Sequence, residues 1–430
     1  MKTAFISLGC VKNQVDSEQL MGRLSSCGFT FTSKPREAEL IIINTCGFIQ
    51  PAKEESINTI LEMAEYKEDR LKYLVVCGCL SQRYKKELEE EMPEVDRFIT
   101  ITEYADFDKI IMDLCKVQGE IPSDPERLLS TDPWMAYLKI GDGCDNRCSF
   151  CAIPLIRGRY HSIPMEDLIR EASALAEKGV KELVVIAQDT TKYGIDFDGK
   201  LHLLELLQKL NEIAGFHWIR VLYMYPDEIT PELIRGMAEL DKVVPYFDIP
   251  MQHASNTLLK KMNRRGTKES VIELCRLIRQ TFRHATLRTT MIVGFPSETE
   301  EQFEELLDFM KEIRWDRLGA FSYSLEEDTP AYHMPDQIPE EVKEDRLKRL
   351  MTLQQSISQE NSETFIGETI EVLVESYDAL QDVYRGRSAY SAPDGVDGLV
   401  FIHSEKRLEK GEFYPVRITE AEVYDLIGEI

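Results

Sequence analysis

Basic residues are scarce in this sequence of 430 residues: 51 Lys and Arg stand against 76 Asp and Glu, and the formal net charge at pH 7 is −25. A chain this acidic repels phosphate polymers at long range unless it carries a local basic patch. Nucleic acid is therefore not expected as the primary partner. The charge would attract a basic partner, although it can also serve solubility alone.

Long apolar runs are absent as well. No segment approaches the roughly 18 residues that a membrane-spanning helix needs. The first ten residues, MKTAFISLGC, lack the charged, apolar and small-residue zones of a signal peptide. We therefore expect a cytoplasmic protein of about two to four domains, with no membrane partner.

Strand and helix signals alternate along the first part of the chain. TAFISL, LIIIN and KYLVVC are short apolar runs, and an amphipathic stretch follows each of them. This alternation predicts an open parallel α/β sheet for residues 1–117. Residues 118–133 carry three prolines and little apolar periodicity, which predicts a linker.

Two further domains are expected after the linker. Residues 134–362 contain six more strand signals separated by amphipathic segments: MAYLKI, ELVVIA, WIRVLY, PYFDIP, ATLRTTMIV and RLGAFSYS. Six consecutive βα units predict a partial TIM-like (β/α)6 barrel. Residues 363–430 change to short strand-like segments with Gly, Asp and Pro between them, which predicts a small β-barrel or sandwich.

Three cysteines are crowded into the stretch GDGCDNRCSFCAIPLIRGRYHS. Cys144, Cys148 and Cys151 have the spacing C-x3-C-x2-C and follow the first predicted barrel strand. Such folds place their chemistry at the carboxyl ends of the strands, and soft thiolates select zinc, copper(I) or iron–sulfur centres. Three explanations remain open: a zinc site completed by a distant ligand, a [4Fe–4S] cluster with one iron left without cysteine, or no metal.

A second set of cysteines follows the three apolar runs of the N-terminal part. Cys10, Cys46 and Cys79 each come just after a predicted strand, and glycine flanks each of them. The carboxyl ends of parallel strands share one edge of a sheet, so we expect these three thiols to be neighbours. Packing is the expected role of the other cysteines, which are Cys27, Cys77, Cys115 and Cys275.

The C-x3-C-x2-C loop after the first barrel strand resembles the radical S-adenosylmethionine (SAM) superfamily. The stretch GCDNRCSFCAIPLIRGRYHS resembles one branch of it, the methylthiotransferases. This resemblance implies catalytic roles for Cys144, Cys148 and Cys151, which would hold a [4Fe–4S] cluster whose open iron binds SAM. It also implies that a second [4Fe–4S] cluster is bound by Cys10, Cys46 and Cys79, and that the C-terminal domain is a TRAM-like antiparallel β-barrel.

Other positions are assigned through the same resemblance. Gln188 and Asp189, in AQDTTKYG, and Gly294, after the run MIV, are expected to bind SAM. For Gly294 the alternative is an ordinary turn with a helix cap at Ser297 or Thr299. The loop pattern continues through Arg157, Gly158 and Arg159, for which salt bridging or turn geometry is the alternative to a direct role.

Two lone histidines lie near predicted loops. Neither His161 nor His253 has a partner at metal-ligand spacing. Each is therefore expected to be a surface residue or a hydrogen-bonded one.

Two branches of the family differ in substrate. One modifies an adenosine of transfer RNA, and the other, the RimO type, modifies an aspartate of the ribosomal small-subunit protein uS12. NTCGFIQPAKEESINTI and AQDTTKYG resemble the RimO type. This implies a transferase that methylthiolates the aspartate β-carbon with two [4Fe–4S] clusters and two SAM molecules, supplied with electrons by a flavodoxin or ferredoxin.

Charge supports the protein substrate independently. Residues 363–430 hold fifteen acidic against six basic residues, which suits a basic client such as a ribosomal protein. Two alternatives are retained. One is the transfer-RNA adenosine methylthiotransferase of the same family, and the other is a non-enzymatic zinc-binding RNA adaptor.

Overall fold

The computed structural model describes residues 1–119, 125–393 and 395–430. Residues 120–124 of the expected linker lie outside the described residues. The chain divides into two compact units. The first comprises Met1–Asp132, Asp142–His161 and Glu326–Thr329, and the second comprises Pro133–Gly141, Ser162–Leu325 and Pro330–Ile430. The first unit thus includes two segments that come from within the predicted barrel sequence.

A five-stranded parallel sheet forms the centre of the first unit, with strand order β2-β1-β3-β4-β5. Its three central strands coincide with the apolar runs, and they are β1 (Lys2–Ser7), β3 (Leu40–Thr45) and β4 (Tyr73–Gly78). The two edge strands are too short to produce a periodic signal in the sequence. They are β2 (Thr30–Phe31) and β5 (Arg97–Ile99).

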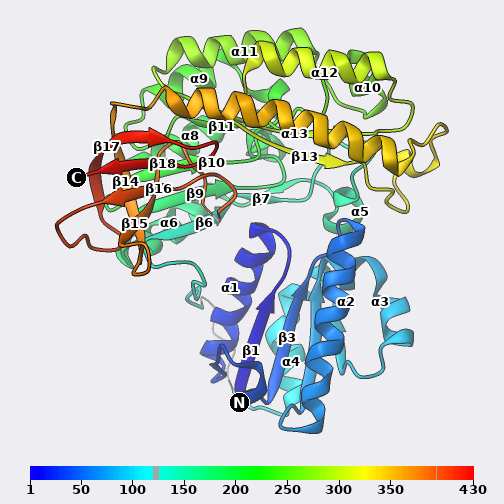
Figure 1. Ribbon diagram of the computed structural model, residues 1–430. Coiled ribbons are helices and arrows are strands. Elements are labelled where there is room, and N and C mark those ends of the chain that lie inside the picture. The colour runs from blue at the N-terminus through cyan, green and yellow to red at the C-terminus, as the bar shows by residue number, and fades with distance from the viewer. Residues whose placement is uncertain (120–124, 394) are drawn as a thin grey trace. The chain divides into compact units, whose positions relative to one another are not determined.

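Helices cover both faces of this sheet (Figure 1). One face packs against α1 (Val11–Ser26) and α4 (Phe107–Cys115), and the other packs against α2 (Gln50–Ala64) and α3 (Cys79–Glu91). Every residue of β3 is buried, as expected for a parallel strand covered on both sides. The packing role predicted for three cysteines is confirmed, because the core on the α1 and α4 side includes Cys27, Cys77 and Cys115.

The six predicted barrel strands are all present in the second unit, as two three-stranded parallel sheets. One sheet has the order β10-β9-β6, with β6 (Met135–Lys139), β9 (Glu182–Ile186) and β10 (Trp218–Val221). The other has the order β11-β12-β13, with β11 (Tyr246–Asp248), β12 (Thr286–Val293) and β13 (Arg317–Ser322). Two backbone hydrogen bonds link β10 to the segment that leads into β11: the Ile219 N–H donates to the Lys242 carbonyl, and the Val244 N–H donates to the Ile219 carbonyl. The sequential strand order confirms the partial barrel.

Helices alternate with these strands, as the periodicity predicted. They are α6 (Met165–Glu177), α7 (Ile195–Asp198), α8 (Leu203–Glu212), α9 (Pro231–Ala238), α10 (Asn256–Lys261), α11 (Lys268–Thr281), α12 (Glu300–Ile313) and α13 (Glu340–Glu363). Cys275 is buried within α11, which agrees with its predicted packing role. No helix among the described residues combines the length and the apolar character that crossing a membrane requires.

The C-terminal segment closes into a five-stranded barrel of order β14-β15-β16-β18-β17. Its strands are β14 (Thr369–Asp378), β15 (Val383–Ser388), β16 (Val400–His403), β17 (Phe413–Ala421) and β18 (Leu426–Glu429). Four of the five pairings are antiparallel, as predicted. The fifth, between β16 and β18, is parallel because β18 lies between β16 and β17.

Buried ion pairs join this small barrel to the strands of the larger one. Glu182, at the start of β9, accepts hydrogen bonds from Arg220 Nε (2.8 Å) and from Arg387 Nη2 of β15 (2.6 Å). The side chains of all three residues are at most 2% exposed. Burial acts to raise the pKa of Glu182, but the Arg387 and Arg220 guanidinium groups hold it at about 2.

Glu182→Ala is therefore expected to lower the free energy of unfolding by about 3–5 kcal/mol, because two buried guanidinium groups lose their shared carboxylate. Chemical denaturation measures this loss. Glu412→Ala is the matched control, since Glu412 also pairs across the two barrels, with Lys181, but is 55% exposed. Its expected cost is below about 1 kcal/mol. Equal costs for the two variants would contradict the prediction.

Candidate functional site

The three N-terminal cysteines lie at one edge of the five-stranded sheet. Cys10 follows β1 and immediately precedes α1, and Cys46 directly follows β3. Cys79 directly follows β4 as the first residue of α3. The three strands are parallel neighbours, so their carboxyl ends meet at this edge. Cys10 is exposed, whereas Cys46 and Cys79 are buried.

The three thiols influence one another electrostatically. Burial raises the pKa of the Cys79 thiol to about 12; Arg157 opposes this rise, and Cys10 and Cys46 add to it. Burial also raises the pKa of Cys46, and Cys10 again adds to the rise. Cys46 and Cys79 would therefore stay protonated at neutral pH by themselves. A metal centre that binds here must displace those protons.

Two glycines allow the cysteine loops to approach closely. Gly9 has a φ of +84°, and a Cβ at this position would lie 2.7 Å from the Cβ of Cys46. Gly78 has a φ of +95°, and a Cβ there would lie 2.2 Å from Asn44 Oδ1. Any larger residue would force these loops apart.

Asn13, which no sequence motif marks, connects the three cysteine loops. Its Nδ2 donates hydrogen bonds to the carbonyl oxygens of Leu8 (3.1 Å) and Thr45 (2.9 Å), just before Cys10 and Cys46. Its Oδ1 lies 3.5 Å from Cys79 Sγ. A polar residue three positions after Cys10, on the first turn of α1, was the available signal.

The other three cysteines lie in a loop of the same compact unit. The Cys144 N–H donates to the carbonyl of Gly158 (3.2 Å), and the Cys151 N–H donates to that of Cys148 (3.0 Å). The three side chains are partly buried. The loop continues into α5 (Ile153–Arg157), where Ala152 and Ile156 form a buried apolar cluster with Cys79. The two sets of cysteines therefore belong to one unit, and Cys79 packs against the residues that follow Cys151.

The donor set suits iron–sulfur clusters. Soft thiolates select zinc, copper(I) or iron–sulfur centres, and three of them would leave a zinc ion in need of a fourth ligand. Three thiols contributed from separate loop positions match a [4Fe–4S] cluster, in which each iron takes its own sulfur ligand.

The predicted SAM contacts lie in the second unit, at the carboxyl ends of β9 and β12. Gln188 is partly buried, and buried Asp189 accepts a hydrogen bond from the Thr191 hydroxyl (2.5 Å). Gly294 has a φ of +71°, and a Cβ there would lie 2.3 Å from Lys343 Cγ, so glycine makes room for α13. The predicted cap at Thr299 is present, with its hydroxyl bound to the Gln302 N–H.

A buried polar cluster surrounds the loop after Gly294. Glu298 accepts hydrogen bonds from the Gly294 N–H and from Arg346 Nη1 (2.9 Å), and it pairs with His253 Nε2 at 3.0 Å. The side chains of Glu298 and His253 are fully buried. Of the two expectations for His253, the hydrogen-bonded one is confirmed and the surface one is wrong. His161 is exposed.

Three family models match successive parts of the chain. Uncharacterized protein family UPF0004 matches residues 2–100, the Radical SAM superfamily matches residues 138–310, and the TRAM domain matches residues 366–430. Full-length relatives agree with this arrangement. The chain is 50% identical to ribosomal protein uS12 methylthiotransferase RimO of Clostridioides difficile (strain 630), with 100% of this chain and 99% of the relative covered.

The chain belongs to the RimO family. Its similarity to the RimO protein of Alkaliphilus oremlandii (strain OhILAs) is 48% identity over 100% of this chain and 99% of the relative. The resemblance inferred from the cysteine motifs is thereby confirmed.

Solved structures support the fold of this RimO family member. The radical SAM methyltransferase TsrM from Kitasatospora setae, with tryptophan substrate and a SAM analogue bound, matches with a TM-score of 0.58 and 12% identity. The match covers 83% of this chain and 89% of that one. The cobalamin-dependent radical enzyme OxsB matches with a TM-score of 0.52 and 14% identity, over 82% and 56%. At these identities the likeness concerns the fold alone.

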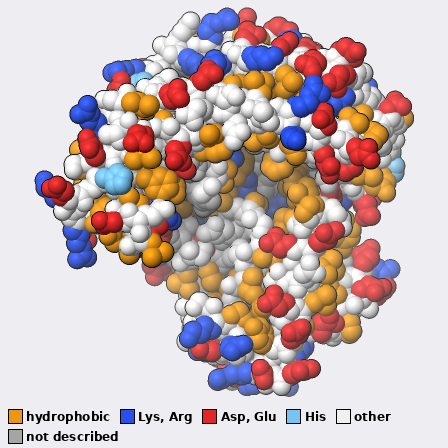
Figure 2. Space-filling model, in the orientation of Figure 1, with side chains coloured by type: hydrophobic (Ala, Val, Ile, Leu, Met, Phe, Trp, Pro, Cys, Tyr) orange, Lys and Arg blue, Asp and Glu red, His pale blue; other side chains and the backbone are white. Residues whose placement is uncertain are grey.

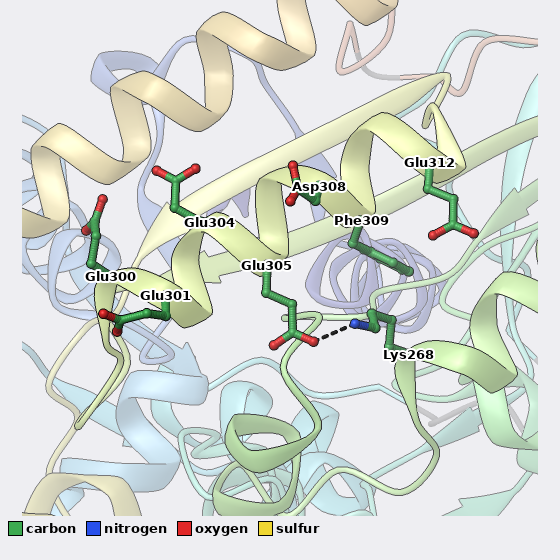
Figure 3. A pocket seen from close by; sticks show the side chains of 8 residues that line it. All are labelled: Lys268, Glu300, Glu301, Glu304, Glu305, Asp308, Phe309 and Glu312. Atoms are coloured by element: carbon green, nitrogen blue, oxygen red, sulfur yellow. Dashed lines mark hydrogen bonds and ion pairs between the residues drawn. The ribbon is translucent and has the colours of Figure 1, made fainter.

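A separate hollow of about 510 Å³ lies along α12 (Figure 3). Six carboxylates line it, and one of them, Glu305, pairs with Lys268 of α11 at 2.5 Å. The lining includes none of the residues predicted to bind a cofactor. The hollow therefore reflects the acidic outer face of α12 and is not part of the candidate site.

Proposed function

We propose that this protein methylthiolates an aspartate side chain of ribosomal protein uS12 by radical SAM chemistry. The observation that carries the proposal is the placement of six cysteines, in two sets of three, within one compact unit of a chain that matches RimO proteins over its full length. The β-carbon of the aspartate is the proposed site of modification, with two SAM molecules used for each product.

The proposed ligands are the two cysteine sets. Cys144, Cys148 and Cys151 would hold the [4Fe–4S] cluster that binds SAM, and Cys10, Cys46 and Cys79 would hold the second cluster. When bound, the clusters supply electrons for SAM cleavage and a site for the sulfur atom. The chain contributes loop positions that are fixed before binding. Asn13 ties two cysteine loops together, and the Ser56 hydroxyl bonds both the N–H and the carbonyl of Cys46.

For SAM itself we propose contacts from Gln188, Asp189 and Gly294. Their position at the carboxyl ends of barrel strands supports this role, because barrel enzymes bind their ligands there.

The proposed domains are residues 1–117, a linker at 118–133, the SAM-binding barrel at 134–362 and the TRAM-like barrel at 363–430. The residues that the three family models match support this division. In the structure, however, Asp142–His161 belongs to the first compact unit.

A basic protein client fits the surface better than nucleic acid does. On the face shown in Figure 2, Lys and Arg side chains stand singly or in small groups among Asp and Glu. Nucleic-acid-binding barrels need cationic grooves and exposed stacking aromatics. In the C-terminal barrel, Tyr384, Tyr390 and Tyr414 pack against the apolar core, whereas Tyr377 is 43% exposed. We also propose a cytoplasmic location and a flavodoxin or ferredoxin as electron donor, since SAM cleavage requires an external reductant.

Intact-mass analysis of uS12 tests the proposed function. Anaerobically reconstituted protein, supplied with SAM, sulfide and a reductant, is expected to add one methylthio group to uS12. Transfer RNA treated in parallel should gain none. The reconstituted protein should hold about eight irons, as two four-iron clusters. Modified adenosine without modified uS12 would favour the transfer-RNA branch, and zinc without sulfide would exclude the enzyme.

A further inference from the structure

Arg157 is a buried cation at the point where the two cysteine sets meet. It ends α5, six positions after Cys151, and its side chain is 2% exposed. Its Nη1 donates to Asp16 Oδ2 of α1 and to Asp142 Oδ2, both at 2.8 Å. Its Nη2 donates to Asn13 Oδ1 and lies 3.7 Å from Cys79 Sγ. One guanidinium group therefore touches both the N-terminal cysteine site and the loop of the second set.

The geometry is specific to arginine. A guanidinium group presents five N–H donors in a planar fork, so it can bond several acceptors at once in fixed directions. Lysine would supply a point charge without that fork. Burying such a charge is costly unless it is paired, and here Asp16 and Asp142 provide the pairing. Salt bridging, which was one of the expectations for this position, is therefore present as a buried network.

We propose that Arg157 is a positioning residue that fixes the loop of Cys144, Cys148 and Cys151 against Cys79, and that its charge raises the reduction potential of the cluster held by Cys10, Cys46 and Cys79. This inference rests on the proposed function. A buried positive charge beside a cluster thiolate stabilises the more negative, reduced state of the cluster. The contacts with Asp16 and Asn13 hold that charge in place.

The charge effect is measured on the first cluster alone. In full-length protein with Cys144, Cys148 and Cys151 replaced by alanine, only the first set can bind a cluster, and a spectroscopic redox titration gives its potential. Arg157→Gln is expected to shift the potential to a more negative value, and Arg157→Lys should shift it less. Asp16→Asn is expected to shift it in the positive direction, because one neutralising carboxylate is lost.

Arg159→Gln is the matched control. Arg159 lies in the same loop, but its side chain is 84% exposed and pairs with Asp145 at 3.2 Å. No shift is expected for it, since solvent screens an exposed charge. Equal potentials in the Arg157→Gln and Arg159→Gln proteins would overturn the charge effect. If the Arg157→Gln protein does not fold, the Asp16→Asn protein provides the test. A reduction potential that is unchanged or more negative in Asp16→Asn would reject the proposed charge effect.

The positioning role is measured in protein that retains all six cysteines. The ratio of 5′-deoxyadenosine to methylthiolated uS12 is expected to rise on the order of tenfold in Arg157→Gln, because misplacement of reacting groups slows the productive step. Arg157→Lys should show the same rise, since it lacks the fork, whereas Arg159→Gln should not. An unchanged ratio in both Arg157 variants would reject the positioning role. If the enzyme without substitutions did not methylthiolate uS12, the proposed function would be wrong. The reduction potentials of the first cluster would still test the charge effect of Arg157.

Discussion

Cys148→Ala is expected to abolish SAM cleavage, and methylthiolation with it. This loop offers three cysteine ligands to a cluster. The substitution leaves two, which cannot hold a four-iron cluster in place. The loop itself should keep its shape, because the bond between the Cys144 N–H and the Gly158 carbonyl and the pairing of Arg157 with Asp142 do not involve the Cys148 thiol. Release of 5′-deoxyadenosine from SAM under reducing conditions is the measurement, and it should fall to the level seen without protein.

Cys275→Ala controls for the loss of a thiol as such. Cys275 is buried in α11, in the second unit, as are Leu274 and Ile278 of the same helix. Its replacement should lower stability by about 1 kcal/mol and leave SAM cleavage unchanged. SAM cleavage by Cys148→Ala at the unsubstituted rate would show that this loop does not hold the reactive cluster.

The strands were predictable from the sequence because each is a short apolar run followed by an amphipathic stretch. The same signal predicts the two cysteine sites, because residues that come just after parallel strands meet at one edge of the sheet. Edge strands of two or three residues, such as β2 and β5, carry no such signal.

The sequence alone does not predict which segments form the first unit, because their packing depends on contacts between side chains that are far apart in the chain. Arg157 and Asp16 are 141 positions apart, and nothing in either local pattern identifies the other as its partner. The same holds for Glu326, which bonds Lys53 of α2 at 2.9 Å and is 273 positions away from it. These pairs bring Asp142–His161 and Glu326–Thr329 into the first unit, although both segments lie within the barrel sequence.

The C-terminal barrel is likewise more firmly attached than its sequence suggested. Short strands and turn signals describe a separable module, yet Arg387 of β15 completes the buried pairing of Glu182 in β9. Removing residues 363–430 would leave Glu182 with one guanidinium group and would destabilise the larger barrel. A role of the acidic C-terminal barrel in client binding would therefore be tested better with exposed point substitutions than with truncation.

Cys46→Ala is expected to eliminate methylthiolation of uS12 while SAM cleavage continues. The first cysteine set would keep two thiols and lose its cluster, so iron should fall from about eight to about four per chain. The fold should persist, because the Ser56 hydroxyl bonds the backbone N–H and carbonyl of residue 46, which alanine retains. Intact mass of uS12 and 5′-deoxyadenosine are measured in the same samples.

Cys77→Ala separates the loss of a cluster ligand from the loss of a buried thiol. Cys77 lies two positions before Cys79, but it packs in the core on the α1 and α4 side of the sheet. Its side chain is fully buried, and burial raises the pKa of the thiol to about 12. This variant should keep both iron content and methylthiolation. If Cys77→Ala lost methylthiolation and Cys46→Ala retained it, the assignment of ligands at this edge would be wrong, because a thiol inside β4 would then bind iron in place of one that follows the end of β3.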